Sequence, residues 1–168
     1  MRIRSQSGLT LLECVILVII IGIVAALLLP PIHGTSCSRV TFCSSNLKSL
    51  WGSQLNYGNQ YGRPNGIMPT ETGSAFWLKL QKSPKPLIDR YEPFFCPLVS
   101  EEVGPGRTSY RGPALPLSDH PELDPVGADK EGNHGEGEGG NVITRLGDIR
   151  SVEEDDVLWI RAKTTTKE

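Results

Sequence analysis

The sequence predicts an α+β protein in which a long N-terminal helix packs on a small antiparallel sheet connected by long proline- and glycine-rich loops. Three observations lead to this fold class. An apolar run covers residues 9–29, an amphipathic helical pattern follows over 37–61, and short strand signals separated by turns occupy the C-terminal half. The 168 residues leave room for one domain of ordinary size and an appendage.

The apolar run has the length of a membrane-spanning helix. Its 21 residues, Leu9–Leu29, extend about 31 Å as a helix at ~1.5 Å per residue, which matches the ~30 Å hydrocarbon core of a bilayer. Arg2 and Arg4 precede the run with no acidic residue beside them. This charge pattern predicts a single-pass protein with a cytoplasmic N-terminus and an exported remainder.

One acidic residue, Glu13, lies near the start of the run. A buried carboxylate costs roughly 2–3 kcal/mol even on lenient insertion scales, so a plain anchor leaves Glu13 without a role. A cleaved secretory signal has a shorter apolar core, and its lipoprotein variant needs an aliphatic residue where Gly34 stands, three residues before Cys37. A membrane-anchored periplasmic binding domain with no filament role stays as the alternative.

The stretch "SGLTLLE" at residues 7–13 resembles the processing signal of type IV prepilins and type II secretion pseudopilins. In that family a prepilin peptidase cuts a short leader after a glycine, and the new N-terminus is methylated. The mature family members carry Glu as their fifth residue and Pro as their twenty-second. Counted from Leu9, Glu13 is fifth and Pro30 is twenty-second. The resemblance therefore implies cleavage between Gly8 and Leu9 and N-methylation of Leu9, where the family usually has Phe.

The resemblance also implies roles and partners. Glu13 is expected to meet the new terminal ammonium, its own or that of the next subunit, and to set the register of assembly. Pro30 is expected to kink the helix because proline cannot donate a backbone hydrogen bond. The implied partners are prepilin peptidase, identical or homologous pilin subunits, an inner-membrane assembly platform and membrane lipid. The implied function is that of a structural filament subunit, in type II secretion or a related pilus, and not of an enzyme.

This resemblance divides the chain into three segments. Residues 1–8 are the cytoplasmic leader, 9–32 the transmembrane and assembly helix, and 33–168 a periplasmic pilin-like domain. Within that domain, "CSSNLKSLWGSQLNYGNQYGRPNG" resembles prepilin-like proteins of planctomycete-type bacteria, and its apolar residues recur at helical spacing. We expect an amphipathic helix over 37–61 that continues the apolar helix beyond the break at Pro30.

The middle of the chain is predicted to contain little regular structure. Residues 73–83 are expected to form a short helix with Phe76, Trp77 and Leu80 facing inward, ended by the prolines that follow. Residues 104–128 contain too much proline and glycine for regular elements, apart from a small edge strand beginning at Tyr110.

The C-terminal part predicts a hairpin followed by a last apolar patch. Residues 141–144 and 148–152 have strand patterns and flank a turn at Leu146-Gly147. The patch at 157–162 is predicted as a strand or a packed turn, and the six residues after it as a frayed tail.

The cysteines predict one disulfide, between Cys43 and Cys96. Cys43 lies in the apolar stripe of the predicted helix, and Cys96 follows two phenylalanines. Cys37 lies six residues before Cys43, nearly on the opposite helix face, and is expected to stay free or to bond between chains. A Cys43–Cys96 bond closes a loop of about 52 residues and contributes about 4 kcal/mol in the chain-entropy model. Buried free thiols are the alternative, and the lack of a C-x-x-C pair argues against metal binding by cysteine.

Acidic residues gather in a glycine-rich region of the C-terminal half. The segment "VGADKEGNHGEGEGGN" resembles the calcium loop of major type II secretion pseudopilins, which implies Ca²⁺ bound by Asp129 and Glu136. Lys130 stands where that loop carries a small residue. The alternative is a solvated acidic loop.

Charge and motifs argue against two other function classes. Residues 98–168 contain 15 acids and 8 bases, which disfavours a nucleic-acid-binding role. The three histidines, His33, His120 and His134, belong to no recognisable catalytic or nucleotide-binding motif.

Overall fold

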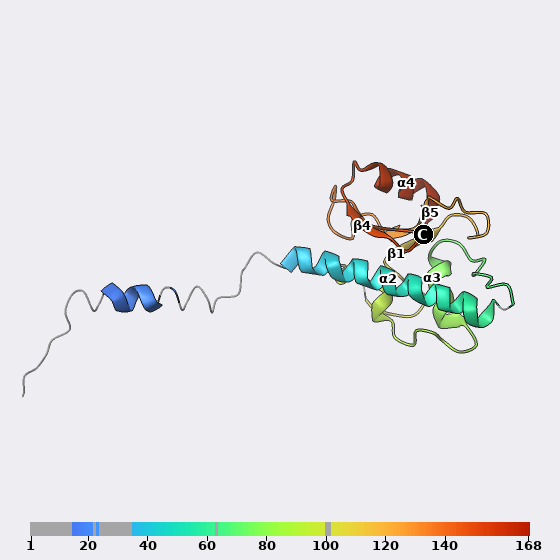
Figure 1. Cartoon of the computed structure of the whole chain (residues 1–168), viewed down its shortest axis with the longest axis horizontal. Helices are drawn as coiled ribbons and strands as arrows, with labels where there is room; N and C mark the ends of the chain where they lie inside the picture. Colours follow the sequence, from blue (N-terminus) through green and yellow to red (C-terminus); the bar gives the residue numbers. More distant parts are fainter. Residues whose placement is uncertain (1–14, 22, 24–34, 63, 100–101) are drawn as a thin grey trace, which may run out of the picture. The chain divides into compact units, whose positions relative to one another are not determined.

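The computed structural model describes residues 15–21, 23, 35–62, 64–99 and 102–168 (Figure 1). The chain divides into two compact units, residues 1–35 and 36–168. The residues predicted for processing and assembly, Gly8, Leu9, Glu13 and Pro30, lie outside the described residues.

The described part of the first unit is helical. Residues 15–21 and 23 form this helical segment, and all their side chains are apolar. Each of these side chains is exposed, from 48 % for Val15 to 69 % for Val18. In the described part of the chain, no helix combines the length and the apolar character needed to span a bilayer.

The longest described helix is α2 (Thr35–Tyr61), which lies in the second unit from its second residue onward. It agrees with the amphipathic helix expected over 37–61. Its buried residues, Cys43, Leu47, Leu50, Trp51 and Gln54, recur at spacings of three and four. This spacing places them on one face of the helix, as the sequence predicts.

Helix α3 (Ser74–Lys82) matches the short helix expected over 73–83. Phe76, Trp77 and Leu80 are fully buried, and the Trp77 indole donates a 3.0 Å hydrogen bond to the Arg111 carbonyl. The chain then passes through a 3₁₀ helix, η1 (Glu92–Phe94), that leads directly to Cys96.

A five-stranded antiparallel sheet forms the centre of the second unit. Its strands are β1 (Tyr110–Pro113), β2 (Pro125–Asp129), β3 (Gly140–Thr144), β4 (Ile149–Val152) and β5 (Thr166–Lys167), in the spatial order β4-β3-β2-β1-β5. The predicted hairpin is present as β3 and β4. Its turn needs Gly147, whose φ of 86° lies in the left-handed region that favours glycine.

Three sequence predictions about the sheet and its surroundings are wrong. Strand β2 lies in a region expected to be irregular, because its Pro-Val-Gly-Ala-Asp sequence carries a bulge and has little strand propensity of its own. Strand β1 is not an edge strand, because the C-terminal residues expected to fray pair with it as β5. Residues 157–162 belong to a helix, α4 (Val157–Thr165), and not to a strand.

The second unit has three layers. Figure 1 shows α4 on one face of the sheet and α2 with α3 on the other. The larger hydrophobic core lies on the α2 and α3 side and includes Leu47, Trp77 and Ile143. A smaller core, built around Trp159, lies between α4 and the opposite face. The fold class predicted from sequence, α+β with a small antiparallel sheet, is confirmed for this unit.

Candidate functional site

The chemically distinctive residues of the second unit meet where α2 contacts the sheet, and their centre is the Cys43–Cys96 disulfide. Cys43 lies on the buried face of α2 and Cys96 lies two residues after η1. The structure contains this predicted bond, with a Cα–Cα distance of 4.8 Å, and both cysteines are buried. The disulfide therefore fastens α2 to a segment 53 residues away in the chain.

Polar contacts reinforce the same junction. The Asn46 side chain donates a 3.0 Å hydrogen bond to the Phe95 carbonyl. The buried Tyr110 hydroxyl lies 3.3 Å from the carbonyl oxygens of both Cys43 and Phe95. Burial, together with the negative charge of Asp129, raises the pKa of the Tyr110 hydroxyl well above its ordinary value. Tyr110 thus stays protonated and remains a donor to this junction.

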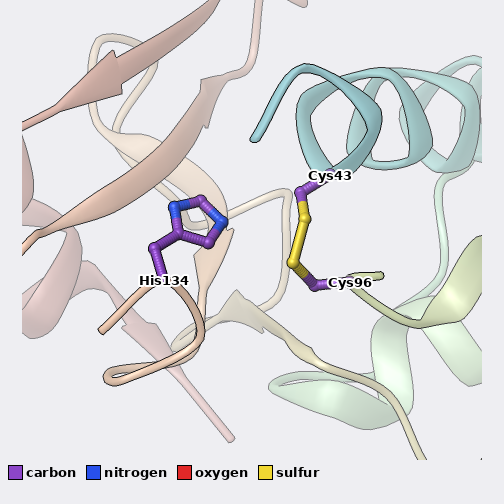
Figure 2. A group of neighbouring side chains, drawn as sticks. All are labelled: Cys43, Cys96 and His134. Carbon is purple, nitrogen blue, oxygen red and sulfur yellow. A yellow bond between two sulfur atoms is a disulfide. The ribbon is translucent and has the colours of Figure 1, made fainter. Parts of the chain in front are cut away.

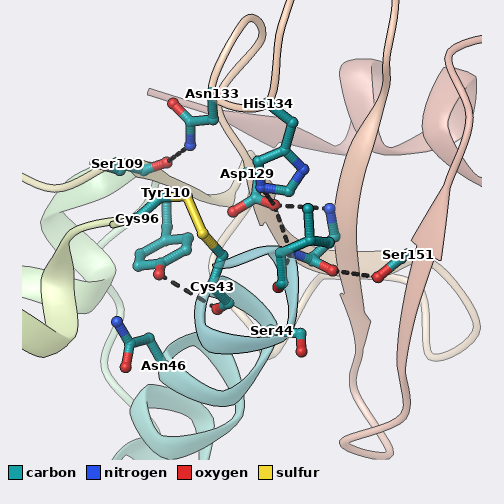
Figure 3. A network of polar contacts seen from close by, with 12 residues as sticks. Cys43, Ser44, Asn46, Cys96, Ser109, Tyr110, Asp129, Asn133, His134 and Ser151 are labelled. Atoms are coloured by element: carbon teal, nitrogen blue, oxygen red, sulfur yellow. Dashed lines mark hydrogen bonds and ion pairs between the residues drawn. A yellow bond between two sulfur atoms is a disulfide. The ribbon is translucent and has the colours of Figure 1, made fainter. Parts of the chain in front are cut away.

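Asp129, the last residue of β2, lies next to this junction and has no solvent exposure. Its Oδ2 atom accepts hydrogen bonds from the backbone and side-chain nitrogens of Asn141, at 2.7 and 2.8 Å (Figure 3). Oδ1 has no hydrogen-bond partner among the described residues. An ionisable group so deeply buried is costly unless its surroundings stabilise it.

Asn141 connects Asp129 with three other elements. It lies on β3, and its side-chain oxygen accepts a hydrogen bond from Ser151 on β4 (Figure 3). Its side-chain nitrogen also lies 3.4 Å from the Val40 carbonyl of α2. The amide of one residue thereby links β2, β3, β4 and the first half of α2.

His134 is brought to the site by a glycine-rich loop between β2 and β3. Its side chain is 4 % exposed, and its Nε2 atom lies 3.1 Å from Asp129 Oδ2, an ion-pair distance without hydrogen-bond alignment. The ring points toward the disulfide (Figure 2). One ring nitrogen and the two sulfur atoms all lie within 4.8 Å of one another. Gly139, which ends this loop with a φ of 71°, has no room for a side chain against the Val152 carbonyl.

The two residues predicted to bind calcium occupy different environments. Asp129 is buried and engaged by Asn141 and His134, whereas Glu136 is exposed. Within the described residues, they do not belong together to a group of three or more candidate metal ligands. Calcium binding stays a prediction, which a change in melting temperature on addition of EDTA would test.

The histidines differ in their surroundings. His33 lies outside the described residues, and buried His120 has its ring nitrogens 3.0 Å from the Pro121 carbonyl and 3.2 Å from the Thr165 carbonyl. His134 alone among the described histidines lies beside both a carboxylate and sulfur atoms. Sequence reasoning did not single it out because its neighbours come from α2, η1 and β2, which are distant in the chain.

In its disulfide form, this site works as a cross-link. Neither cysteine carries a thiol that His134 could activate, and both sulfur-bearing residues are shielded from solvent. The contacts join α2 to the sheet through one covalent bond and a set of buried hydrogen bonds.

Comparisons with known proteins give no match to this chain, whether the comparison is with family models, with curated proteins or with solved structures.

Proposed function

We propose that this chain is a structural subunit of a pseudopilus or type IV pilus-like filament, processed by prepilin peptidase and assembled through its N-terminal helix. The observation that carries the proposal is the spacing of Gly8, Glu13 and Pro30 within one apolar run. Each residue type alone is common. The three together, with a basic segment ahead of them, fit a leader that is cut before a helix assembles.

The exposed apolar helix of the first unit supports this proposal. Residues 15–21 and 23 leave every side chain at least 48 % exposed. Apolar surface of this extent is stable only when lipid or another protein covers it. Membrane lipid before assembly and neighbouring subunits after assembly supply that cover in turn.

The cross-link in the second unit is also consistent with a filament subunit. In a helical filament, a pulling force is transmitted to each globular domain through the helix to which that domain is attached. The disulfide at Cys43 and the contacts of Asn46 and Asn141 attach α2 to the rest of the unit at successive points along its first half. The domain therefore resists separation from α2 more strongly than apolar packing alone would allow.

Processing supplies the charge that Glu13 needs. Hydrolysis of the Gly8–Leu9 amide leaves a carboxylate on Gly8 and an ammonium on Leu9. An ammonium within a few ångströms stabilises a carboxylate in an apolar environment, because the pair places no net charge there. The proposed partner of Glu13 is the Leu9 ammonium of the neighbouring subunit, so that one ion pair fixes the axial position of each added chain.

The proposal places the chain in the inner membrane, with residues 1–8 cytoplasmic and the globular unit periplasmic. Its partners are prepilin peptidase, other pilin-like subunits, an assembly platform and lipid. The apparatus it serves is most simply type II secretion.

Mass spectrometry of the protein extracted from membranes tests the processing step. The expected N-terminal residue is Leu9, with or without one methyl group. An N-terminus that retains Met1, or one close to Cys37, would contradict the proposal and favour a plain anchor or a cleaved secretory signal.

A matched pair of substitutions tests the assembly step. Glu13→Gln should abolish filament formation while membrane insertion persists, because it removes the charge without changing the size of the side chain. Glu122→Gln, the same change at an exposed position of the globular unit, should leave assembly intact. Unchanged assembly in the Glu13 variant would contradict the proposed filament role.

A further inference from the structure

We propose that reduction of the Cys43–Cys96 disulfide creates, at the same position, a binding site for one thiophilic divalent cation of the zinc class. The ligands are the two cysteine thiolates and the imidazole of His134. This inference is independent of the proposed filament function, because it concerns only residues of the second unit.

The first observation is the convergence of three soft donors. Cys43 comes from α2, Cys96 follows η1, and His134 comes from the loop between β2 and β3. Their candidate ligand atoms lie within 4.8 Å of one another (Figure 2). Two sulfurs and one imidazole nitrogen form a donor set typical of zinc, with a fourth position left for water or a carboxylate. The sequence argues against such a site because it has no C-x-x-C pair, but the fold collects the donors from separate segments.

The second observation is a buried carboxylate beside the histidine. Asp129 is fully buried, its Oδ1 has no hydrogen-bond partner among the described residues, and its Oδ2 lies 3.1 Å from His134 Nε2. Carboxylates commonly orient metal-binding histidines and increase their basicity. Asn141 in turn holds Asp129 through two hydrogen bonds, so the position of His134 is supported from β3.

The third observation is a route from solvent. His134 lines a surface hollow of about 200 Å³, together with Val40, Gly140, Ser151 and Val152 of the surrounding elements. Two carboxylates, Glu138 and Glu153, lie at the same hollow and are exposed. Acidic side chains at the entrance of a site raise the local concentration of cations. The hollow therefore adjoins one of the three proposed ligand residues, His134.

Charge balance favours this site over a hard-cation site. Two thiolates neutralise a divalent cation, so the bound complex adds no net charge to a buried region. Asp129 then keeps its existing partners. A calcium ion, by contrast, needs six or more oxygen ligands, and sulfur is a poor ligand for it.

The chemistry proceeds in two balanced steps. A dithiol reductant transfers two electrons to the Cys43–Cys96 bond, giving two thiols and the oxidised cyclic disulfide of the reductant. The cation then displaces one proton from each thiol and forms two metal–sulfur bonds, and the two protons pass to buffer. Oxidation of the two thiolates re-forms the disulfide and releases the metal ion. Either the disulfide or the bound metal ion therefore links Cys43 to Cys96.

Cobalt(II) titration of the full-length protein tests the proposal. Cys14 and Cys37 are first replaced by Ser, so that only Cys43 and Cys96 contribute thiols. After reduction without oxygen, one equivalent of Co²⁺ should give thiolate charge-transfer absorption and the visible bands of tetrahedral coordination. One equivalent of Zn²⁺ should remove both signals. The oxidised protein should give neither.

Histidine and aspartate variants assign the remaining ligand and its support. His134→Gln should lose the tetrahedral signal, whereas His120→Gln, a change at another buried histidine, should keep it. Asp129→Asn should weaken Co²⁺ binding by about 10- to 100-fold, as expected for a residue that orients a ligand.

Circular dichroism of each protein separates loss of binding from loss of folding. If reduction loosens the second unit, Zn²⁺ should restore its folded spectrum, because metal binding adds to folding stability. The proposal is overturned if the reduced, folded protein gives no charge-transfer band. It is equally overturned if Zn²⁺ fails to restore folding, or if His134→Gln binds Co²⁺ as tightly as the parent.

Discussion

The two units of this chain differ in how far their apolar side chains are exposed. In the first unit, the helical residues 15–21 and 23 expose between 48 % and 69 % of each side chain. In the second unit, residues such as Leu47, Trp77 and Ile143 expose nothing. The second unit buries the residues of its larger core, whereas the described helical residues of the first unit are each at least 48 % exposed. In the proposed function, lipid or neighbouring subunits cover this exposed helix.

The contrast also extends to polar groups. The second unit buries Asp129, Asn141 and Gln54 and satisfies most of their atoms with backbone or side-chain partners. Such networks tie particular elements together, since each buried polar atom left without a partner costs about 1–3 kcal/mol. The described helix of the first unit has no polar side chain to satisfy. Changes in the two units should therefore affect different measurements.

The largest expected effect within the second unit comes from its disulfide. Replacing Cys43 and Cys96 together by Ser should lower the free energy of unfolding by about 4 kcal/mol, because the unfolded chain regains the freedom of a long loop. Urea unfolding of the protein in detergent measures this change. Cys37→Ser should cost far less. Equal losses in the two variants would mean that the disulfide is not the main fastening of α2.

A charge placed in the first unit should affect assembly without affecting that stability. Ile19→Lys puts an ammonium on a residue that is 55 % exposed, at a cost of roughly 2.5–3.5 kcal/mol in an apolar environment. This corresponds to a fall of about 100-fold in assembly or membrane retention.

The matched control is Leu123→Lys, at a residue of the second unit that is 76 % exposed. It should leave both assembly and retention unchanged, because Leu123 is already in water. If the two lysine variants behaved alike, the contrast between the units would have no functional meaning.

The pH dependence of stability should report the burial of Tyr110. The raised pKa of its hydroxyl means that the folded state keeps a proton that the unfolded state loses above the ordinary tyrosine pKa of 10.0. The stabilisation of the folded state by the protonated Tyr110 hydroxyl is fully present below that pH. Above it, the free energy of unfolding falls by up to about 1.4 kcal/mol per pH unit.

Unfolding measured on both sides of this pH in wild type and Tyr110→Phe isolates the effect. At neutral pH, the free energy of unfolding of the variant should be lower by roughly 0.5–1.5 kcal/mol, because the hydrogen bond of the hydroxyl is lost. Above pH 10, this free energy should fall less steeply in the variant than in the wild type. Parallel curves for the two proteins would show that Tyr110 titrates normally.

The smallest effect concerns the cap of α4. The Asp156 side chain accepts a 2.7 Å hydrogen bond from the Leu158 backbone nitrogen at the start of this helix. Asp156→Ala should therefore lower the free energy of unfolding by about 1 kcal/mol. The neighbouring change Asp155→Ala, at an exposed residue, should alter stability by only a few tenths of a kcal/mol in the same urea experiment.

Elements with strong periodicity or turn chemistry were predictable from the sequence. Helices α2 and α3 have apolar residues at helical spacing, and the β3–β4 hairpin has Gly147 at the position that needs a positive φ. Helix α4 was missed although its signal was present, since Asp156 is a favourable N-cap directly before Val157. The residues after that cap include Val157, Trp159 and Ile160, which are types enriched in strands.

Elements stabilised mainly by tertiary contacts were not predictable. Strand β2 has a proline and a glycine and forms because β1 and β3 pair with it on both sides. The disulfide followed from the stripe that carries Cys43 and the aromatic context of Cys96. The approach of His134 to both cysteines depends on a loop whose course the sequence does not specify, so that part of the site required the structure.

Strand β5 makes residues 166–167 part of the sheet. Lys167 and Thr166 pair with Gly112 and Pro113, and the Glu168 carbonyl lies against Gly73. Deleting Thr166 and Lys167 would uncover the edge of β1, which is a template for pairing with other chains and for aggregation. A tag or reporter inserted in the exposed turn at 105–107 should leave this pairing intact.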